Sequence, residues 1–93
     1  MTLIEQTYSL LRDADLVRTR EQFSTDYVGK NPNWYSYQTH VGRDFSVLAA
    51  AHCLRTISKL SNAEGIQSKQ RRSLARAGAL LDGYLREQHL ALA

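Results

Sequence analysis

The sequence predicts an all-α fold of four to five helices, of which the last is long. Apolar residues recur at helical spacing along the chain, and no stretch alternates apolar and polar residues between turn signals as a strand would. With 93 residues, a chain containing that many helices has no room for a sheet. A chain of this length forms one core, so we expect a single domain over residues 1–93.

The first helix is expected over residues 3–13, with Thr2 as its N-cap. Its predicted inner face consists of Leu3, Ile4, Tyr8 and Leu11. A second helix is expected after Thr19, because Thr19-Arg20-Glu21-Gln22 has the pattern of a capping box. In such a box the Thr19 hydroxyl accepts a hydrogen bond from the Gln22 amide, and the Gln22 side chain reaches back toward the cap.

The second helix should end at Gly29, since a helix C-cap favours a residue that can take a positive φ. The third helix is expected over residues 32–41. Asn31 is a good N-cap, and Pro32 loses nothing at the first helical position because its missing N–H would have no partner there. Gly42 should end this helix.

The fourth helix is expected over residues 47–60, capped by either Asp44 or Ser46. A polar connection over residues 61–68, containing Gly65, leads to the last helix. The predicted core stripe of the fourth helix consists of Val47, Ala50 or Ala51, Leu54 and Ile57, with Leu48 alongside.

The last helix is expected over about residues 69–89. Its leucines approach heptad spacing, small residues recur every fourth position, and two glycines inside a helix cost about 1 kcal/mol each relative to alanine. Such a cost is tolerated where another helix comes close. We expect either a two-fold dimer interface or packing of this helix on its own domain. The candidate dimer interface consists of Leu74, Ala75, Gly78, Leu81 and Leu85.

The second and third helices have the spacing of a helix-turn-helix: a short helix ending on glycine, a tight turn, and a second short helix. The segment Gln22-Phe-Ser-Thr-Asp-Tyr-Val-Gly-Lys-Asn-Pro-Asn-Trp-Tyr-Ser-Tyr resembles that of small phage repressor and Cro-like regulators, with a likeness covering about residues 16–60. The positions that match are Phe23 and Tyr27 or Val28 as apolar residues of the first helix, Ser24 at the helix crossing, Gly29 in the turn, and Tyr35 as the buried residue of the second helix.

Two positions differ from that family. One additional residue separates Ser24 from Gly29, so the first helix is longer or the turn is altered. Gln38 stands where the family usually has an aliphatic residue.

The resemblance implies that the third helix enters the major groove of DNA. The candidate base-contacting residues are Asn33, Ser36, Tyr37 and His40, with Trp34 at the edge of that face. The candidate phosphate-contacting residues are Arg20, Lys30 and Arg43. No arginine lies on the face to read guanine. The alternative is that Trp34, Tyr35 and Tyr37 are packing residues.

The net charge of +3 is concentrated in the second half of the chain. Residues 1–45 contain five Lys and Arg against six Asp and Glu, a balance of −1, whereas residues 46–93 contain seven against three, a balance of +4. The densest group is Lys69, Arg71, Arg72 and Arg76 at the start of the last helix. This basic cluster could contact DNA backbone, bind an acidic protein or RNA, or be a solvated helix surface.

Composition and spacing favour a binding protein over an enzyme. The single cysteine, Cys53, excludes an internal disulfide framework, and its apolar helical context is typical of a buried thiol. His40, His52 and His89 lack metal-ligand spacing, and no nucleotide-binding loop occurs. We expect no catalytic residues, metal or cofactor. A secretory signal and a membrane-length apolar stretch are both absent, so we expect a cytoplasmic protein.

The function favoured at this point is a sequence-specific DNA-binding transcriptional regulator of bacterial or phage type. It would act as a homodimer on double-stranded DNA, and as a repressor by occupying its site. The alternative is a small helical protein-binding module, such as a phage-encoded inhibitor or adaptor, that does not bind DNA. It would use the aromatic surface of the third helix or the basic cluster.

Overall fold

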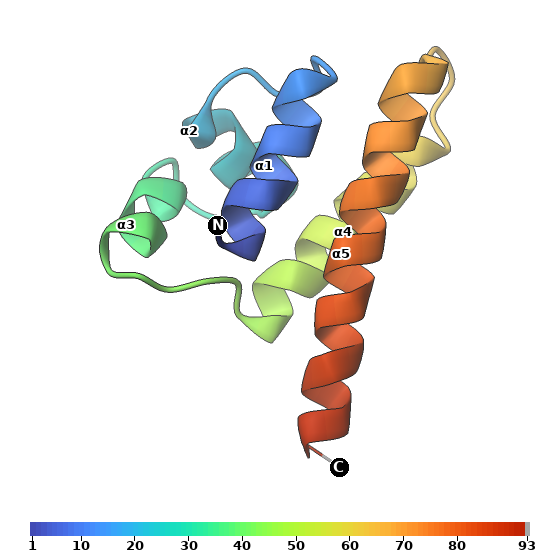
Figure 1. Cartoon of the computed structure of the whole chain (residues 1–93). Helices are drawn as coiled ribbons and strands as arrows, with labels where there is room; N and C mark the ends of the chain where they lie inside the picture. The colour runs from blue at the N-terminus through green and yellow to red at the C-terminus, as the bar shows by residue number, and fades with distance from the viewer. Residues whose placement is uncertain (93) are drawn as a thin grey trace.

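The computed structural model describes residues 1–92, with side chains up to His89, and confirms the all-helical fold class (Figure 1). The elements are α1 (Leu3–Asp13), α2 (Arg20–Gln22), the π-helical turn η1 (Phe23–Tyr27), α3 (Trp34–His40), α4 (Val47–Ser61) and α5 (Ser68–Leu92). Within residues 1–92 there is no strand, and no helix combines the length and apolar character needed to cross a membrane.

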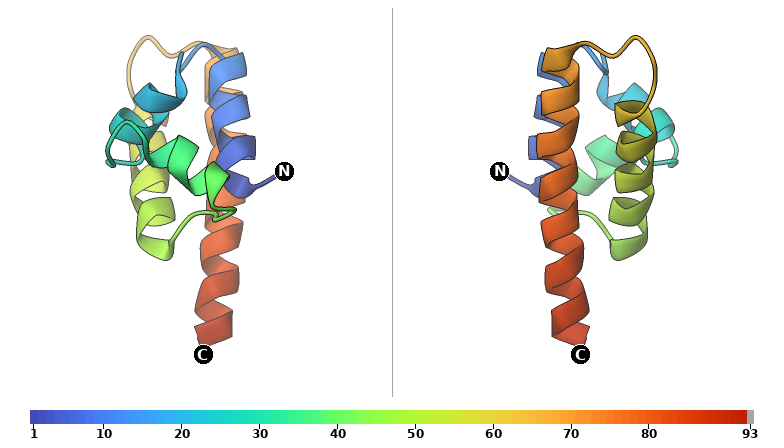
Figure 2. Two further views of the ribbon diagram at one scale, coloured as in Figure 1. Left: turned by 90° about the vertical axis from the view of Figure 1, so that its left-hand side faces the viewer. Right: turned by 90° about the vertical axis from the view of Figure 1, so that its right-hand side faces the viewer.

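The long helix α5 supports the rest of the domain. It packs along α4 and along α1, while α2 and η1 form one continuous helix that contacts both α3 and α4. Figure 2 shows α1 and α5 at one side of the domain and α4 at the other. The last part of α5 extends past the other helices (Figure 1). The helix pair α2–η1 and α3 therefore lies on a rigid base built by α1, α4 and α5.

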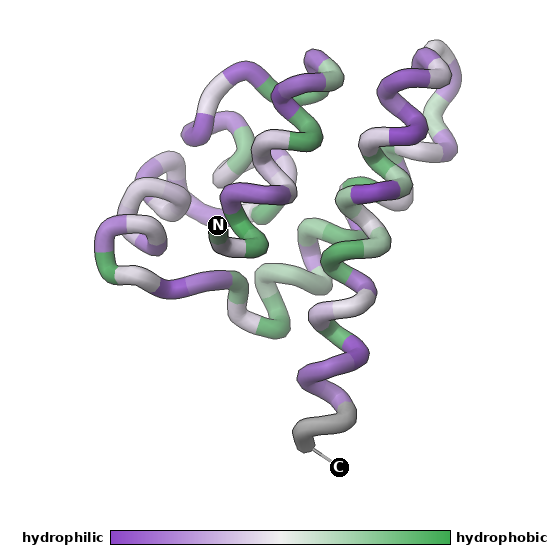
Figure 3. The backbone as a smooth tube through the Cα atoms, viewed as in Figure 1, coloured by the Kyte–Doolittle hydropathy of each residue, from purple (hydrophilic) through white to green (hydrophobic). Residues whose placement is uncertain are grey.

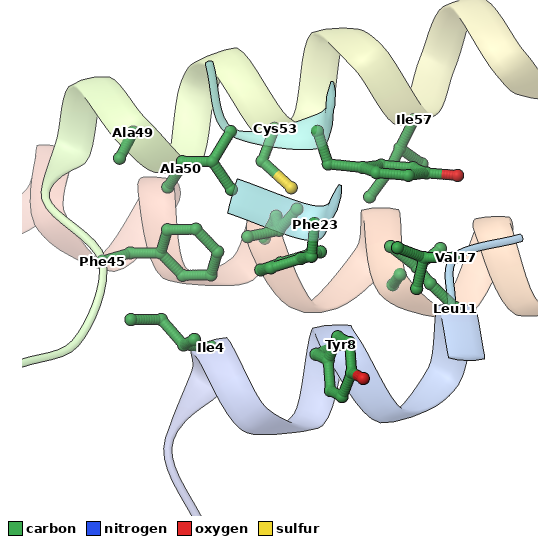
Figure 4. Packing of buried hydrophobic residues seen from close by; sticks show 14 of the residues in the cluster. Ile4, Tyr8, Leu11, Val17, Phe23, Phe45, Ala49, Ala50, Cys53 and Ile57 are labelled. Atoms are coloured by element: carbon green, nitrogen blue, oxygen red, sulfur yellow. The ribbon is translucent and has the colours of Figure 1, made fainter. Parts of the chain in front are cut away.

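Phe23 lies in the middle of the core, with no exposed surface (Figure 4). Its ring centroid is 5.7 Å from that of Tyr8 and 6.1 Å from that of Tyr35, both edge to face, and 6.0 Å from that of Tyr27. Each such pair contributes about 0.5–1.5 kcal/mol beyond simple burial. Since these rings come from α1, η1 and α3, the aromatic cluster sets the positions of the three elements together.

The carboxylate of Asp44 binds the first turn of α1. Its two oxygens accept hydrogen bonds from the backbone N–H groups of Leu3 and Ile4 at 2.8 and 3.0 Å, and one also accepts from its neighbour Phe45. The sequence allows either Asp44 or Ser46 as the N-cap of α4. Ser46 caps α4 by accepting from the Ala49 N–H at 3.1 Å, and Asp44 instead neutralises unpaired donors at the start of α1.

Further bonds hold the rest of the α3–α4 loop. The Gln38 side-chain amide donates to the carbonyl oxygen of Asp44 at 3.1 Å, and the Tyr84 hydroxyl donates to that of Phe45 at 2.6 Å. The loop that follows α3 is thus attached to α1, α3 and α5. Gln38 stands where the Cro-like family usually has an aliphatic residue, and in this chain it holds the loop through its hydrogen bond to Asp44.

The core stripe predicted for α4 is partly wrong. Val47 is 41% exposed and Leu48 is 81% exposed, and Figure 3 shows that the start of α4 is hydrophobic. The buried residues are Ala49, Ala50, Cys53 and Ile57. In the first turns of α4, apolar residues lie on most sides of the helix, so the sequence allows several buried faces. Close packing against α5 and η1 buries the face with small side chains.

The predicted dimer interface on α5 is wrong at its centre. Leu74 and Leu81 have no exposed surface. A Cβ at Gly78 would lie 3.6 Å from Leu54 and 3.7 Å from Ile57, so this glycine allows α4 to approach α5. These residues pack within their own chain, as the alternative expectation had it. Of the remaining two, Ala75 is exposed and Leu85 is half-buried.

We predict that Asp44→Ala lowers the free energy of unfolding by about 1–2 kcal/mol, because the amides of Leu3 and Ile4 lose their acceptor. Urea unfolding followed by circular dichroism measures the change. Glu64→Ala, at an exposed loop position, is the control and should change stability by less than about 0.5 kcal/mol. Equal effects of the two variants would contradict the role assigned to Asp44.

We also predict that stability falls at alkaline pH. Burial raises the pKa of the Cys53 thiol from 9.0 to about 12 and that of the Tyr27 phenol from 10.0 to about 12. The unfolded chain therefore loses these protons first, and stability declines between about pH 9 and pH 12, by at most about 1.4 kcal/mol per pH unit for each group. Cys53→Ala should reduce this slope in urea unfolding. An unchanged slope would be inconsistent with a buried, protonated thiol.

Candidate nucleic-acid interface

The first helix of the helix pair begins after Thr19, which is its N-cap as expected. The Thr19 hydroxyl accepts from the Gln22 N–H at 3.0 Å. The Gln22 side chain reaches back, but it accepts from the N–H of Arg18 at 2.8 Å rather than from that of the cap residue. Both bonds satisfy backbone donors at the start of α2.

The additional residue between Ser24 and Gly29 is accommodated by the π-helical turn η1. The Val28 N–H bonds to the carbonyl of Phe23, five residues earlier, at 3.2 Å, and the Lys30 N–H bonds to that of Ser24 at 2.9 Å. Gly29 takes the positive φ predicted for it, +72°. A π turn is wider than an α turn by one residue, so Ser24 and Gly29 both keep their expected roles.

Ser24 lies where the two helices of the pair meet. Its hydroxyl accepts from the backbone N–H of Tyr35 at 3.1 Å and donates to the carbonyl of Arg20 at 2.9 Å. Ser24 is fully buried and Tyr35 is 6% exposed. The buried face of α3 is therefore held by one hydrogen bond and by the aromatic cluster, and this fixes which face of α3 points to solvent.

The third helix is shorter than predicted. It spans Trp34–His40 instead of residues 32–41. The Asn31 side-chain oxygen does accept a backbone N–H, that of Asn33 at 2.9 Å, but the Trp34 N–H then bonds to the Asn31 carbonyl in a tight turn. The α-helical pattern consequently begins only after that turn.

The end of α3 follows the prediction. Gly42 has a φ of +72°. Its N–H bonds to the carbonyl of Thr39 at 3.3 Å, and the Arg43 N–H bonds to that of Gln38 at 2.9 Å. This pair of bonds is a Schellman motif, which satisfies the last carbonyls of the helix.

The solvent-facing side of α3 carries the residues singled out from the sequence. Asn33, Ser36, Tyr37 and His40 are all exposed, and Tyr37 is 56% exposed. Trp34 is half-buried, with its ring centroid 5.6 Å from that of Phe45, so it is chiefly a packing residue. Tyr35 is buried, as expected. The packing alternative thus applies to Trp34 and Tyr35 but leaves Tyr37 free.

Three cations surround α3. Lys30 precedes it and Arg43 follows it, and both are exposed. The Arg20 guanidinium carbon lies 5.4 Å from the centroid of the Tyr35 ring. Burial raises the pKa of the Tyr35 phenol, and the charge of Arg20 opposes this shift. The phenol therefore stays neutral beside Arg20.

A shallow hollow of about 280 Å³ brings Arg20 together with α3. Its lining consists of Glu5, Arg20, Tyr35, Ser36, Thr39 and His40. Two candidate base-contacting residues thus share one surface with a candidate phosphate-contacting residue. Sequence reasoning missed Thr39, which follows Ser36 by three positions on the same helix, and Glu5, which only the folding of α1 against α3 brings there.

The basic cluster of α5 lies away from α3. The first turn of α5 is at the C-terminal end of α1, where the Gln70 side chain donates to the carbonyl of Ala14 at 3.1 Å. The loop after α3 is at the opposite end of α1, where Asp44 binds. An 11-residue helix is about 16 Å long, so about the length of α1 separates the first turn of α5 from the loop that carries Arg43.

Within the described residues, no three His, Cys, Asp or Glu side chains gather as a metal site would require. Cys53 is fully buried. Its thiol packs as the small apolar core residue that its sequence context predicted.

A known family model matches most of the chain. Residues 4–91 match the model of DUF6626, described as a family of unknown function. No curated protein and no solved structure matches the chain.

We predict that Ser24→Ala destabilises the protein by about 1–2 kcal/mol, because the buried N–H of Tyr35 loses its acceptor. Ser36→Ala, the same substitution at an exposed position of α3, should cost less than about 0.5 kcal/mol. Thermal and urea unfolding of both variants provide the comparison. Indifference of stability to Ser24→Ala would mean that the hydrogen bond does not hold α3.

Proposed function

The chain belongs to the DUF6626 family, and we propose that it is a sequence-specific DNA-binding transcriptional regulator that places α3 in the major groove of DNA. The observation that carries the proposal is the division of α3 into two faces. Tyr35 anchors one face through Ser24, and the other face presents Ser36, Tyr37 and His40 to solvent. The resemblance of residues 16–60 to phage repressor and Cro-like regulators supports the same function.

The dimensions of α3 suit this role. A helix with its side chains is about 10–12 Å across, and the major groove is about 12 Å wide, so the seven residues of α3 can lie in it. Asn33 can bond both polar groups of an adenine edge, and the hydroxyls of Ser36 and Tyr37 can bond bases or phosphates. His40, at the last turn, can do either.

The cations fit phosphate contacts at both ends of α3. Lys30 and Arg43 flank the helix in the chain, and Arg20 lies over Tyr35 at the rim of the hollow. About three phosphate contacts per chain give a logarithmic salt slope between about −2 and −3. That slope is shallow, so two chains on one DNA site would bind far more tightly than one.

Repression needs no further domain under this proposal, since occupation of a promoter is sufficient. The cytoplasm, where such DNA is found in bacteria, is the compartment we propose. A homodimer is the proposed binding form, because helix-turn-helix proteins read half-sites about one DNA turn apart.

One observation favours a second candidate, a protein-binding module that does not bind DNA. Three exposed aliphatic side chains lie at the end of α3 and the start of α4, where Val41 and Val47 are each 41% exposed and Leu48 is 81% exposed. An exposed apolar surface of this kind is typical of a protein contact. Under this candidate α3 would support the contact rather than read DNA.

The experiment that tests the proposal is selection from random DNA duplexes, followed by fluorescence anisotropy on the enriched sequence at several salt concentrations. We expect a two-fold sequence and an affinity that falls with salt. Ser36→Ala/Tyr37→Ala should lower specific affinity by about tenfold or more while leaving thermal unfolding unchanged. Lys30→Ala/Arg43→Ala should reduce the magnitude of the salt slope by about 2.

Two controls separate the candidates. Arg55→Ala removes an exposed cation of α4 and should leave the salt slope unchanged. Leu48→Ser removes an aliphatic side chain that is 81% exposed and should leave DNA affinity unchanged. Absence of sequence enrichment, or equal binding by the Ser36→Ala/Tyr37→Ala variant, would reject DNA reading by α3 and leave the protein-binding module.

A further inference from the structure

An open groove lies between α1 and α5 on the side of the domain away from α4. Its hollow is about 480 Å³ in volume, and Leu80, 36% exposed, is at its rim. The lining residues are Met1, Gln6, Ser9, Leu10 and Asp13 from the N-terminal region, and Arg76, Ala79 and Leu80 from α5. The helix pair and the proposed DNA contacts do not use this groove.

One stripe of α5 runs along the groove. Successive residues of a helix are rotated by about 100° around its axis, and this rotation places six residues of α5 on one outward face. This α5 stripe consists of Arg72, Arg76, Ala79, Leu80, Gly83 and Glu87. Its N-terminal end is basic, its middle is apolar or small, and its C-terminal end is acidic. The only ion pair among the described side chains is Arg86–Asp82, so no residue of the α5 stripe is paired.

Gly83 has no packing role within its own chain. A Cβ at Gly83 would meet nothing within 4 Å, whereas one at Gly78 would touch Leu54 and Ile57. Glycine inside a helix costs about 1 kcal/mol relative to alanine. At Gly78 the approach of α4 accounts for that cost, while at Gly83 the chain itself offers no such reason. Close packing of a helix from another molecule would account for the cost at Gly83.

We propose that α5 packs antiparallel against α5 of a second copy of this chain, along the α5 stripe and over the groove. The two-fold axis passes between Ala79 and Leu80. In this register Arg72 faces the partner's Glu87, Arg76 crosses the partner's Gly83, and Leu80 enters the partner's hollow.

The sequence of charges along the α5 stripe favours a second copy of the chain as the partner and an antiparallel orientation of the two helices. A two-fold contact places the same surface on both chains, so the surface must complement itself. An antiparallel pairing puts the basic end of each stripe against the acidic end of the other, whereas a parallel pairing would put Arg72 against Arg72. A nucleic acid would suit Arg72 and Arg76 but would be repelled by Glu87 and would leave Leu80 unburied. The proposal holds whether or not α3 binds DNA.

Sedimentation velocity of the full chain over a range of concentrations tests the proposal. The wild-type chain should show a concentration-dependent dimer. Arg72→Glu and Glu87→Arg should each weaken the dimer by about tenfold or more, since each creates like-charge contacts at two symmetric positions. The double variant Arg72→Glu/Glu87→Arg should restore the wild-type dissociation constant, because it reverses both charges of each pair.

Two further variants serve as matched controls. Arg71→Glu makes the same charge reversal in the same basic cluster, but on a different face of α5, so it should leave the dimer unchanged. Leu80→Glu should abolish the dimer while thermal unfolding shows a folded monomer, because Leu80 is at the rim of the groove and not in the core.

A wild-type chain that stays monomeric at millimolar concentration would overturn the proposal, as would a dimer that the double charge reversal fails to restore. If the chain is monomeric and Arg72→Glu instead lowers affinity for duplex DNA, the α5 stripe is a nucleic-acid contact. Because α3 variants are not part of this test, its failure would leave the proposed DNA reading by α3 standing.

Discussion

The position of α3 depends on Asp44, in the loop that follows it. The carboxylate of Asp44 accepts the N–H groups of Leu3 and Ile4, and its backbone carbonyl accepts the side chain of Gln38 on α3. One residue therefore connects the start of the first helix to the helix that carries the candidate interface. Ser24 performs the matching task on the other side of α3 by accepting the Tyr35 N–H. Between these two attachments α3 can keep a single orientation, and a surface that reads DNA edges requires such a fixed orientation.

Local signals predicted the helices well because they act within a few residues. Thr2, Thr19 and Ser46 cap helices, and Gly29 and Gly42 end them, as their sequence neighbours indicate. The α4 stripe and the role of Asp44 were not predictable in this way. The role of Asp44 depends on contacts between residues about 40 positions apart, and the buried face of α4 depends on which helices pack against it. A short window of sequence contains neither kind of information.

The same distinction applies to the candidate site. Exposure of Ser36, Tyr37 and His40 followed from placing Tyr35 on the buried face, since a helix fixes the angles between its residues. The hollow shared with Arg20 and Glu5 required the tertiary fold. On α5 the small residues were noticed from the sequence, but they serve two different faces. Gly78 packs against α4, and Gly83 points to open space. The structure thus moves the candidate dimer surface to the α5 stripe, away from Leu74 and Leu81.

The charge asymmetry of the chain acquires a different meaning in this arrangement. The first turn of α5, where the basic cluster begins, lies at the opposite end of α1 from the loop that follows α3, so it adds little to a duplex held by α3. Figure 1 shows α3 to the left of α5. In the dimer we propose, a two-fold axis perpendicular to α5 and running from left to right in that view would leave both α3 helices on the same side. In that dimer Arg72 would pair with the partner's Glu87 and would be unavailable to DNA. The proposed dimer and the proposed DNA contact would therefore use separate charges, so each could be altered without the other.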